Sequence, residues 1–276
     1  MDTNKLSFYA NEIRKGALTA IYSAKSGHPG GSLSIADILS YLYFHEMNID
    51  PKNPKMENRD RFVLSKGHTC PALYAALAHR GFFPVEDLVI FRHTGVYLQG
   101  HPDMKNIPGI DMSSGSLGQG ISAACGMALS AKLSEKSYRV YTIVGDGESE
   151  EGQVWEAAMF AAHYGLNNLT AFVDFNGLQI DGEVTKVMNP TPLDEKFKAF
   201  GWNVAVIDGH SFEEIAAAVE MAKKSDKPTA IICKTVKGKG VSFMENKAEW
   251  HGVAPNKEQY DKAMQELVAV EACLAK

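Results

Sequence analysis

The amino-acid sequence predicts an α/β fold in which helices flank a single doubly wound parallel sheet. Apolar runs of strand length alternate with segments of helical periodicity along most of the 276 residues. The clearest example, residues 138–182, has the strand, helix, strand pattern that normally makes a right-handed parallel unit. The chain has no internal repeat and no low-complexity segment. We therefore expect one domain over residues 1–276.

Composition narrows the class of protein. The chain is 45% hydrophobic with a formal net charge of −5, which favours neither nucleic acid nor an anionic membrane as a partner. The lysine-rich stretch KTVKGKG, residues 234–240, is expected to be a solvated loop. The N-terminus lacks the apolar core of a signal peptide, and no run of eighteen apolar residues indicates a membrane span. We expect a cytoplasmic protein with free thiols, because its four cysteines form no CxxC pair: Cys70, Cys125, Cys233 and Cys273.

The first third of the chain is expected to contain three helices and one strand. Residues 26–32, SGHPGGS, are too rich in glycine and proline for regular structure and are expected to form a loop. Ser34 is expected to cap the next helix, with Asp37 completing a variant capping box. Residues 48–60 are polar and are expected to form a loop. The helices are expected at residues 6–24, 35–47 and 71–79, and the strand at residues 61–64.

The remaining chain continues the alternation of helices and strands. Residues 182–192 are polar, and we expect them to be irregular and to pass over the site. Ser211 and Glu214 form a capping box at the start of a helix. Further helices are expected at residues 86–91, 121–133, 153–164, 193–200, 211–223 and 257–274, and further strands at residues 140–144, 169–175, 202–207 and 229–236.

Two polar side chains follow the two strands of the central unit. Asp146 lies just past the first strand, and Asn176 lies just past the second. Ligands of open α/β sheets bind at the carboxyl ends of the strands, so these two oxygen donors are expected to face one small volume. Mg²⁺ prefers oxygen ligands and is usually bound by carboxylates together with substrate phosphates. The backbone N–H groups of the turn at Gly147 also suit an anion, so we expect a metal-bridged diphosphate site.

Glycine-containing loops hold the other candidate functional residues. His28, His68, His101 and His251 all lie in such loops, where functional side chains concentrate. Residues 113–120, SSGSLGQG, precede a helix and are expected either to contact phosphate or pyrimidine through N–H groups or to form a tight packed loop. The remaining histidines have no such setting and are expected to be structural: His45, His79, His93, His163 and His210.

Seven motifs in order make the sequence resemble transketolase. They are SGHPGGSLSIADIL, DRFVLSKGH, GHPD, SGSLGQGIS, GDGESEEGQVWEAA, DFNGLQIDG and WHG, and together they span nearly the whole chain. The resemblance implies the thiamine-diphosphate-binding fold, in particular the domain that binds the diphosphate. It also implies a function in the pentose phosphate pathway. One departure is Ser116, which stands where the family more often has proline and leaves the backbone contacts of that loop plausible.

The resemblance implies a role for each matching position. Metal ligation by Asp146, Asn176 and the Leu178 carbonyl is expected, with Mg²⁺ or Ca²⁺ as the ion. The cofactor diphosphate is expected to contact Gly147, His68 and His251, and the cofactor rings to lie beside Gly115 and Leu117. His28 and His101 are expected to contact the sugar substrate, and His28 and His251 are candidates for proton transfer. Glu151 is expected to belong to a carboxylate network that crosses to the active site of the partner.

Length sets this chain apart from most of the family it resembles, whose members are commonly more than twice as long. The missing domains include the one that supplies the ring-activating glutamate, the aromatic pocket for that ring and the basic residues for the sugar phosphate. We therefore expect the N-terminal subunit of a split transketolase, completed by a separate C-terminal subunit. We expect it to form a homodimer within an α₂β₂ assembly, to act on sugar phosphates and to be inactive alone; an excised domain is the other account.

Two other functions remain open at this stage. One is a subunit of a related thiamine-diphosphate carboligase, of the deoxyxylulose-phosphate or dihydroxyacetone synthase type. The other is a non-catalytic protein that binds thiamine diphosphate or assists assembly. The histidines of SGHPGG and WHG favour a sugar-handling transketolase over the first, and the presence of His28, His101 and His251 argues against the second.

Overall fold

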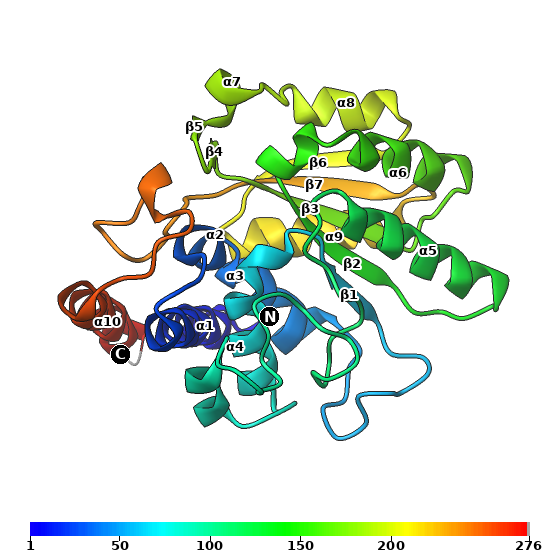
Figure 1. Cartoon of the computed structure of the whole chain (residues 1–276). Helices are drawn as coiled ribbons and strands as arrows, with labels where there is room; N and C mark the ends of the chain where they lie inside the picture. The colour runs from blue at the N-terminus through cyan, green and yellow to red at the C-terminus, as the bar shows by residue number, and fades with distance from the viewer. Residues whose placement is uncertain (275–276) are drawn as a thin grey trace.

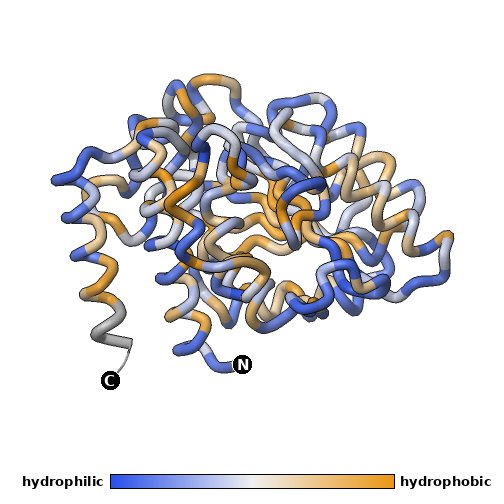
Figure 2. Tube along the Cα trace, turned by 60° about the horizontal axis from the view of Figure 1, so that its bottom comes forward, coloured by the Kyte–Doolittle hydropathy of each residue, from blue (hydrophilic) through white to orange (hydrophobic). Residues whose placement is uncertain are grey.

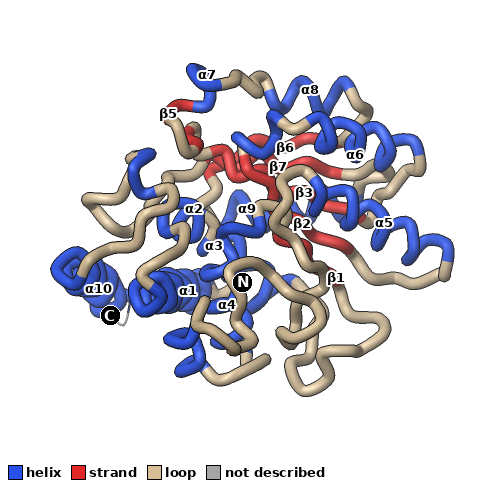
Figure 3. The backbone as a smooth tube through the Cα atoms, in the orientation of Figure 1, coloured by secondary structure: helices blue, strands red, loops and turns tan. Residues whose placement is uncertain are grey.

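Five parallel strands form the central sheet of the computed structural model, which describes residues 1–274 and the side chains through residue 270 (Figures 1 and 3). This confirms the predicted fold class. The strands lie in the order β1-β2-β3-β7-β6. Their register sets Gly145 beside Asp174 and Asp174 beside Cys233, so three neighbouring strands end at nearly the same level. Their bounds are β1 Arg61–Leu64, β2 Val140–Gly145, β3 Leu169–Phe175, β6 Asn203–Asp208 and β7 Thr229–Lys234.

Helices cover both faces of this sheet, as a doubly wound fold requires (Figure 1). One core packs α1, α3, α4 and α9 against the sheet, and the other packs α5, α6 and α8 against its opposite face. The helices are α1 Thr3–Ala24, α2 Pro29–Ser34, α3 Ala36–Tyr41, α4 Cys70–Arg80, α5 Gln119–Leu133, α6 Gly152–His163, α7 Val184–Val187, α8 Leu193–Ala199, α9 Phe212–Lys224 and α10 Lys257–Leu274.

Alternate residues of each strand enter the two cores. Tyr141 and Ile143 of β2 belong to the first core, whereas Val140 and Val144 belong to the second. Because both faces of the sheet are buried, the strands are continuous apolar runs rather than alternating patterns. Figure 2 shows these apolar strands enclosed by more polar helices and loops. A third cluster joins α1 and α10 to the loop that contains Trp250.

Short and irregular helical turns account for several differences from the expected elements. The helix expected at residues 35–47 is α3 followed by a π-helix at Leu42–Glu46. The segment expected to be helical at residues 86–91 is a 3₁₀ helix at Val85–Ile90. Further 3₁₀ turns lie at Gly67–Thr69, Gly147–Glu150 and Ala248–Trp250.

The prediction that residues 26–32 form only a loop is wrong, because α2 begins at Pro29. Proline is tolerated in the first turn of a helix, where its missing N–H is not needed. Gly30 and Gly31 then allow close packing that side chains would prevent. A Cβ on Gly30 would lie 2.9 Å from the Trp250 carbonyl oxygen, and one on Gly31 would lie 2.8 Å from Thr69 Cγ2. Tertiary contact therefore stabilises a helix that its own composition disfavours.

Ser34 is not the N-cap that its position suggests. It is the last residue of α2, and its hydroxyl donates a hydrogen bond of 2.8 Å to Asp174 Oδ2. Ile35 occupies the cap position of α3 without a side-chain hydrogen bond. The expected cap at Ser211 is confirmed, since its Oγ accepts from the Glu214 N–H at 3.3 Å.

Two small elements lie in the segments after β3. A two-stranded hairpin pairs β4 Leu178–Gln179 with β5 Gly182–Glu183, and α7 follows it directly. The expectation that residues 182–192 are wholly irregular is therefore only partly right. No helix among the described residues is long and apolar enough to cross a membrane. Cys70, Cys125 and Cys233 are buried free thiols, and the side chain of Cys273 lies outside the described residues.

Candidate functional site

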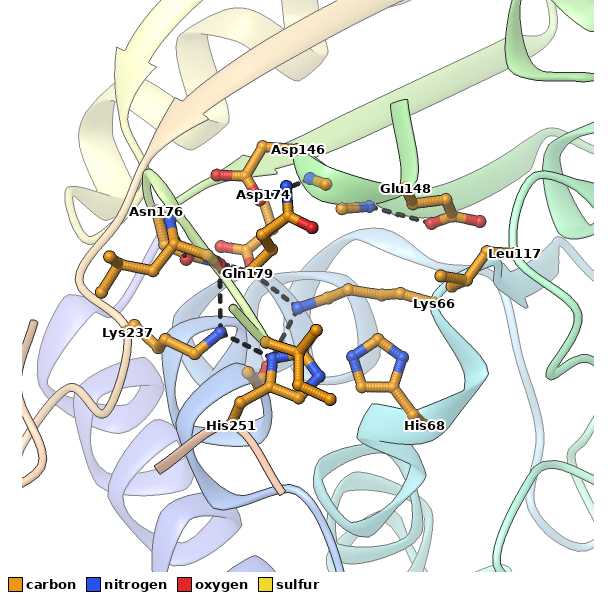
Figure 4. A pocket seen from close by; sticks show the side chains of 15 residues that line it. Lys66, His68, Leu117, Asp146, Glu148, Asp174, Asn176, Gln179, Lys237 and His251 are labelled. Atoms are coloured by element: carbon orange, nitrogen blue, oxygen red, sulfur yellow. Dashed lines mark hydrogen bonds and ion pairs between the residues drawn. The ribbon is translucent and has the colours of Figure 1, made fainter. Parts of the chain in front are cut away.

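A cavity of about 240 Å³ lies at the carboxyl ends of β2, β3 and β7 (Figure 4). Loops that follow different strands line it, as the rule for open α/β sheets predicts. The cavity brings together seven of the residues singled out from the sequence: His68, Leu117, Asp146, Gly147, Asn176, Leu178 and His251. It also contains Lys66, Glu148, Asp174, Gln179 and Lys237, which sequence reasoning did not assign to the site.

Asp146 is a buried carboxylate between two strand-end loops. Its Oδ1 accepts from the Gly147 N–H at 2.8 Å, and its Oδ2 accepts from the Gly177 N–H at 2.6 Å. The second bond ties the turn after β2 to the turn after β3. Burial, together with the negative charge of Asp174, raises the pKa of Asp146 to about 7. The site therefore contains an acid that a nearby cation would favour in its charged form.

Asn176 and Leu178 line the same cavity as Asp146. The Asn176 carboxamide donates through Nδ2 to Asp174 Oδ2 at 3.0 Å and accepts through Oδ1 from the Leu178 N–H at 3.1 Å. The Leu178 carbonyl accepts a hydrogen bond of 3.1 Å from Lys237 Nζ. These contacts fix the direction of both oxygens through the backbone of the turn.

Asp174, at the end of β3, links four segments of the chain. It is fully buried, and its Oδ2 accepts from Lys66 Nζ at 2.6 Å in addition to Ser34 and Asn176. Its Oδ1 accepts from the Thr235 hydroxyl. Burial alone would raise the pKa of Asp174, but the Lys66 charge and these hydrogen bonds outweigh it and lower the pKa. The residue thereby holds the loops after β1, β3 and β7 and helix α2 in one arrangement.

Lys237 contradicts the expectation that KTVKGKG is a solvated loop. Its side chain is almost completely buried, and its Nζ lies 3.1 Å from His251 Nδ1. Burial and the neighbouring charge of Lys66 lower the pKa of Lys237 to about 8. Lys237 follows the carboxyl end of β7, the same position that singled out Asp146 and Asn176. The position of Lys237 after a strand could have indicated a site residue, whereas the lysine-rich composition of the stretch predicted exposure to solvent.

Three histidines meet at the rim of the cavity. The His28 ring lies 5.0 Å from the His68 ring and 5.6 Å from the His251 ring, and His68 and His251 are 5.3 Å apart between ring centroids. Burial lowers the pKa of His28 to about 4 and that of His251 to about 3, and it lowers the pKa of His68 as well. All three are neutral at pH 7, and His28 Nδ1 is buried without a hydrogen-bond partner.

The other candidate residues lie beside the cavity rather than in its lining. His101 packs against Gly115, where an added Cβ would come within 3.0 Å of His101 Cδ2. Glu151 is an exposed N-cap of α6, and its Cβ lies 3.0 Å from the position that a Cβ on Gly118 would take. The structure thus places Gly115, His101 and Glu151 around the loop that precedes α5.

Glu148 explains why that loop lies against the site. Its carboxylate is buried and accepts from the Gly145 N–H and the Gly118 N–H, both at 2.9 Å, and from Ser65 Oγ at 2.5 Å. Burial raises the pKa of Glu148. One side chain therefore joins the ends of β1 and β2 to the loop that bears Leu117. The acid-rich turn GDGESEE indicates that carboxylates lie near the site, but the sequence does not show which of them points inward.

Comparison with known proteins identifies the family. Residues 6–271 match the family model described as transketolase, thiamine diphosphate binding domain. A Clostridium protein named 6-deoxy-6-sulfo-D-fructose transketolase subunit SqwG is 51% identical over 95% of this chain and 96% of its own length. A Phocaeicola vulgatus protein, named as one of the subunits of apulose-4-phosphate transketolase, is 41% identical over 97% of this chain and 95% of its own length.

Solved structures agree with this assignment. The transketolase of Campylobacter jejuni superposes with a TM-score of 0.91 at 35% identity, over 99% of this chain and 46% of that one. A Pichia stipitis transketolase in complex with sedoheptulose 7-phosphate gives a TM-score of 0.91 at 33% identity, over 98% of this chain and 43% of that one. The chain spans less than half of these solved transketolases and nearly the full length of the two subunits. The chain belongs to the transketolase family, as a thiamine diphosphate binding domain of the length of a transketolase subunit.

Proposed function

We propose that this chain is the N-terminal subunit of a cytoplasmic split transketolase, which binds thiamine diphosphate through a divalent metal. The supporting observation is the cavity at the strand ends, which combines three buried carboxylates, two buried lysines and neutral histidines. The two subunit-length relatives support a division of the enzyme between two chains. The proposed reaction moves a two-carbon ketol unit from a ketose phosphate to an aldose phosphate.

Asp146, Asn176 and the Leu178 carbonyl are the proposed ligands of Mg²⁺ or Ca²⁺. Burial raises the pKa of Asp146 to about 7, and a divalent cation would offset that cost by stabilising the carboxylate. Within residues 1–274, no group of three or more His, Cys, Asp or Glu residues is arranged to hold a metal. An ion here must take amide, carbonyl and diphosphate oxygens as well, which is the usual environment of Mg²⁺. The Leu178 carbonyl has a second lone pair besides the one that Lys237 uses.

Lys237, His68, His251 and Gly147 are proposed to contact the diphosphate. The buried Lys237 ammonium supplies positive charge where water is largely excluded, which strengthens its attraction for an anion. Gly115 and Leu117 are proposed to border the rings of the cofactor, since the Glu148 carboxylate fixes their loop beside the cavity. These contacts would orient the cofactor without any movement of the sheet.

Thiamine diphosphate, when bound, supplies the carbanion chemistry of ketol transfer. The chain supplies binding and proton handling. His28 and His251 are neutral at pH 7, and a neutral imidazole can take part in proton transfer with a sugar hydroxyl. His101 is proposed to contact the sugar as well. Glu151 is proposed to join a carboxylate network that reaches the second active site of an α₂β₂ assembly.

Complementation tests the proposal. The purified chain is assayed for ketol transfer with thiamine diphosphate and Mg²⁺, alone and after mixing with the C-terminal subunit of a split transketolase. We expect turnover only in the mixture, because the proposed C-terminal subunit supplies the residue that activates the cofactor ring. The donors should include a ketose phosphate and 6-deoxy-6-sulfo-D-fructose, the sugar in the name of the 51% identical relative. Turnover by the isolated chain would contradict the proposal. So would a complete lack of turnover in the mixtures if the mixtures also failed to bind thiamine diphosphate.

A further inference from the structure

His210 lies outside the cavity and has a bonding pattern that only one form of histidine provides. It follows the carboxyl end of β6 and lies beside the end of β7. Its Nε2 lies 2.9 Å from the Val236 N–H, and its Nδ1 lies 2.7 Å from Asp37 Oδ2. A backbone N–H can only donate, so Nε2 must accept and Nδ1 must hold the proton. The ring is therefore a neutral tautomer with both nitrogen atoms engaged.

Asp37 selects that tautomer. It is buried on α3, and its Oδ2 contacts both His210 and the Arg14 guanidinium of α1. Burial would raise the pKa of Asp37, but the Arg14 charge and the His210 hydrogen bond outweigh it, so the carboxylate stays charged and can only accept. Arg14 also packs against the loop that follows β7, since a Cβ on Gly240 would lie 3.3 Å from Arg14 Cδ.

The segment that His210 contacts carries Lys237. Three successive residues are each held by a different group: Thr235 donates to Asp174, Val236 donates to His210, and Lys237 donates to the Leu178 carbonyl. The turn that holds His210 packs tightly on this segment, because a Cβ on Gly209 would lie 2.5 Å from Thr235 Cγ2. The backbone immediately before Lys237 is thus fixed in part by His210, which is not among the residues that line the cavity.

We propose that His210, held in one tautomer by Asp37 and Arg14, is a positioning residue that sets Lys237 against the diphosphate end of the cofactor. This inference rests on the proposed cofactor function of the cavity. It predicts that loss of His210 weakens the diphosphate part of binding and leaves the part due to the thiamine rings unchanged. A residue that served only general stability would weaken both parts alike.

Calorimetric titration measures both parts in the complex of this chain with its C-terminal subunit, in the presence of Mg²⁺ and with thiamine diphosphate and thiamine as probes. We expect His210→Ala to weaken thiamine diphosphate binding by roughly tenfold, the lower range for loss of a supporting contact in a binding site. Thiamine binding should not change. His210→Gln retains an acceptor for the Val236 N–H and should restore most of the affinity. The exposed His93→Ala is the matched control and should behave like the unaltered chain.

Nitrogen NMR of the cofactor-free full chain, labelled at histidine, tests the tautomer directly. We expect His210 to show a protonated Nδ1 and an unprotonated Nε2 at pH 7. Asp37→Asn should weaken this preference, because a neutral amide oxygen is a poorer acceptor than a carboxylate, and should weaken thiamine diphosphate binding while the imidazole remains in place. Asp37→Asn also tests the positioning role of His210 if His210→Ala does not fold.

The outcomes separate the two proposals. If the unaltered complex did not bind thiamine diphosphate, the proposed function would fall. If it bound and His210→Ala bound with equal affinity, or lost thiamine binding in equal measure, the positioning role would be wrong. A protonated Nε2 in the unaltered chain would also overturn it.

Discussion

At the scale of single residues, the site is built from ionisable groups whose pKa values are shifted by burial and by neighbouring charges. The imidazoles of His28, His68 and His251 lie close together and are neutral, because burial disfavours their protonated forms and nearby cationic side chains add to that effect. Asp174 keeps its charge only because Lys66 and three neutral donors surround it. The charge state of each group is therefore a property of its neighbours.

These shifts predict a pH dependence of stability in the cofactor-free chain. The folded-state pKa values of His28 and His251, about 4 and about 3, lie below the ordinary value of 6.5. As the pH falls below about 6.5, the unfolded chain binds protons at these histidines before the folded chain does. Their contribution to the free energy of unfolding therefore declines, down to about pH 4 for His28 and about pH 3 for His251. Urea unfolding at pH 7.5 and pH 5 should show a smaller difference for the double variant His28→Gln/His251→Gln than for the unaltered chain.

The comparison between variants isolates the imidazoles. Asp146 acts in the opposite direction, since its raised pKa of about 7 stabilises the folded chain as the pH falls. Its contribution is the same in both proteins if the fold is unchanged. His93→Gln, at an exposed position, is the control and should leave the pH dependence as it is. An equally steep decline in the double variant would show that these histidines do not carry the effect.

At the scale of elements, close backbone approach decides how the loops meet the sheet. Helix α5 begins against the end of β1, where a Cβ on Gly120 would lie 2.4 Å from Ser65 Cα. Backbone atoms cannot move aside as the end of a flexible side chain can. The N-terminus of α5, and with it the loop bearing Leu117, depends on the absence of a side chain at position 120.

Two glycines of α5 give a matched pair of variants. We expect Gly120→Ala to lower the free energy of unfolding by about 1–3 kcal/mol, the usual cost of overpacking. Gly126→Ala should raise it by about 0.5–1 kcal/mol, because a Cβ there meets nothing within 4 Å and alanine favours the helix. Urea denaturation of the isolated chain measures both. A stabilised Gly120→Ala would mean that the loop before α5 can shift without cost.

At the scale of the whole molecule, α6 leaves an apolar face uncovered. Met159, Phe160 and Tyr164 are 59%, 37% and 47% exposed, and Leu133 at the end of the adjoining α5 is 77% exposed. Apolar side chains gathered on one surface often mark an interface with another protein. We infer that this face contacts another chain of the proposed assembly.

A charge placed on that face should weaken assembly. Met159→Glu puts a carboxylate where burial against a partner would leave it unpaired, and we expect the affinity between subunits to fall by roughly tenfold or more. Sedimentation with the C-terminal subunit measures the change. Val268→Glu on α10, at a position 52% exposed, is the matched control. If both variants assembled like the unaltered chain, the interface would lie elsewhere.

The sequence by itself determined the order of the main strands and helices, the parallel sheet and the positions that follow its strands. Asp146, Asn176 and His68 could be recognised as candidate site residues because the loops after parallel strands meet at one edge of the sheet, independently of their side chains. The seven motifs also identified the family, which the comparisons confirmed. The elements and the strand-end positions are local or topological properties, so periodicity and spacing along the chain are enough to predict them, whereas the family rested on the resemblance of the motifs.

The tertiary structure alone decided which charged groups are buried and which of them are paired. Lys237 belongs to a lysine-rich stretch that composition assigns to solvent, yet it lies inside the cavity between Leu178 and His251. Asp174 and Glu148 join segments up to 140 positions apart in sequence. Desolvation and pairing depend on neighbours brought together by folding, and the order of residues along the chain does not encode those distances directly.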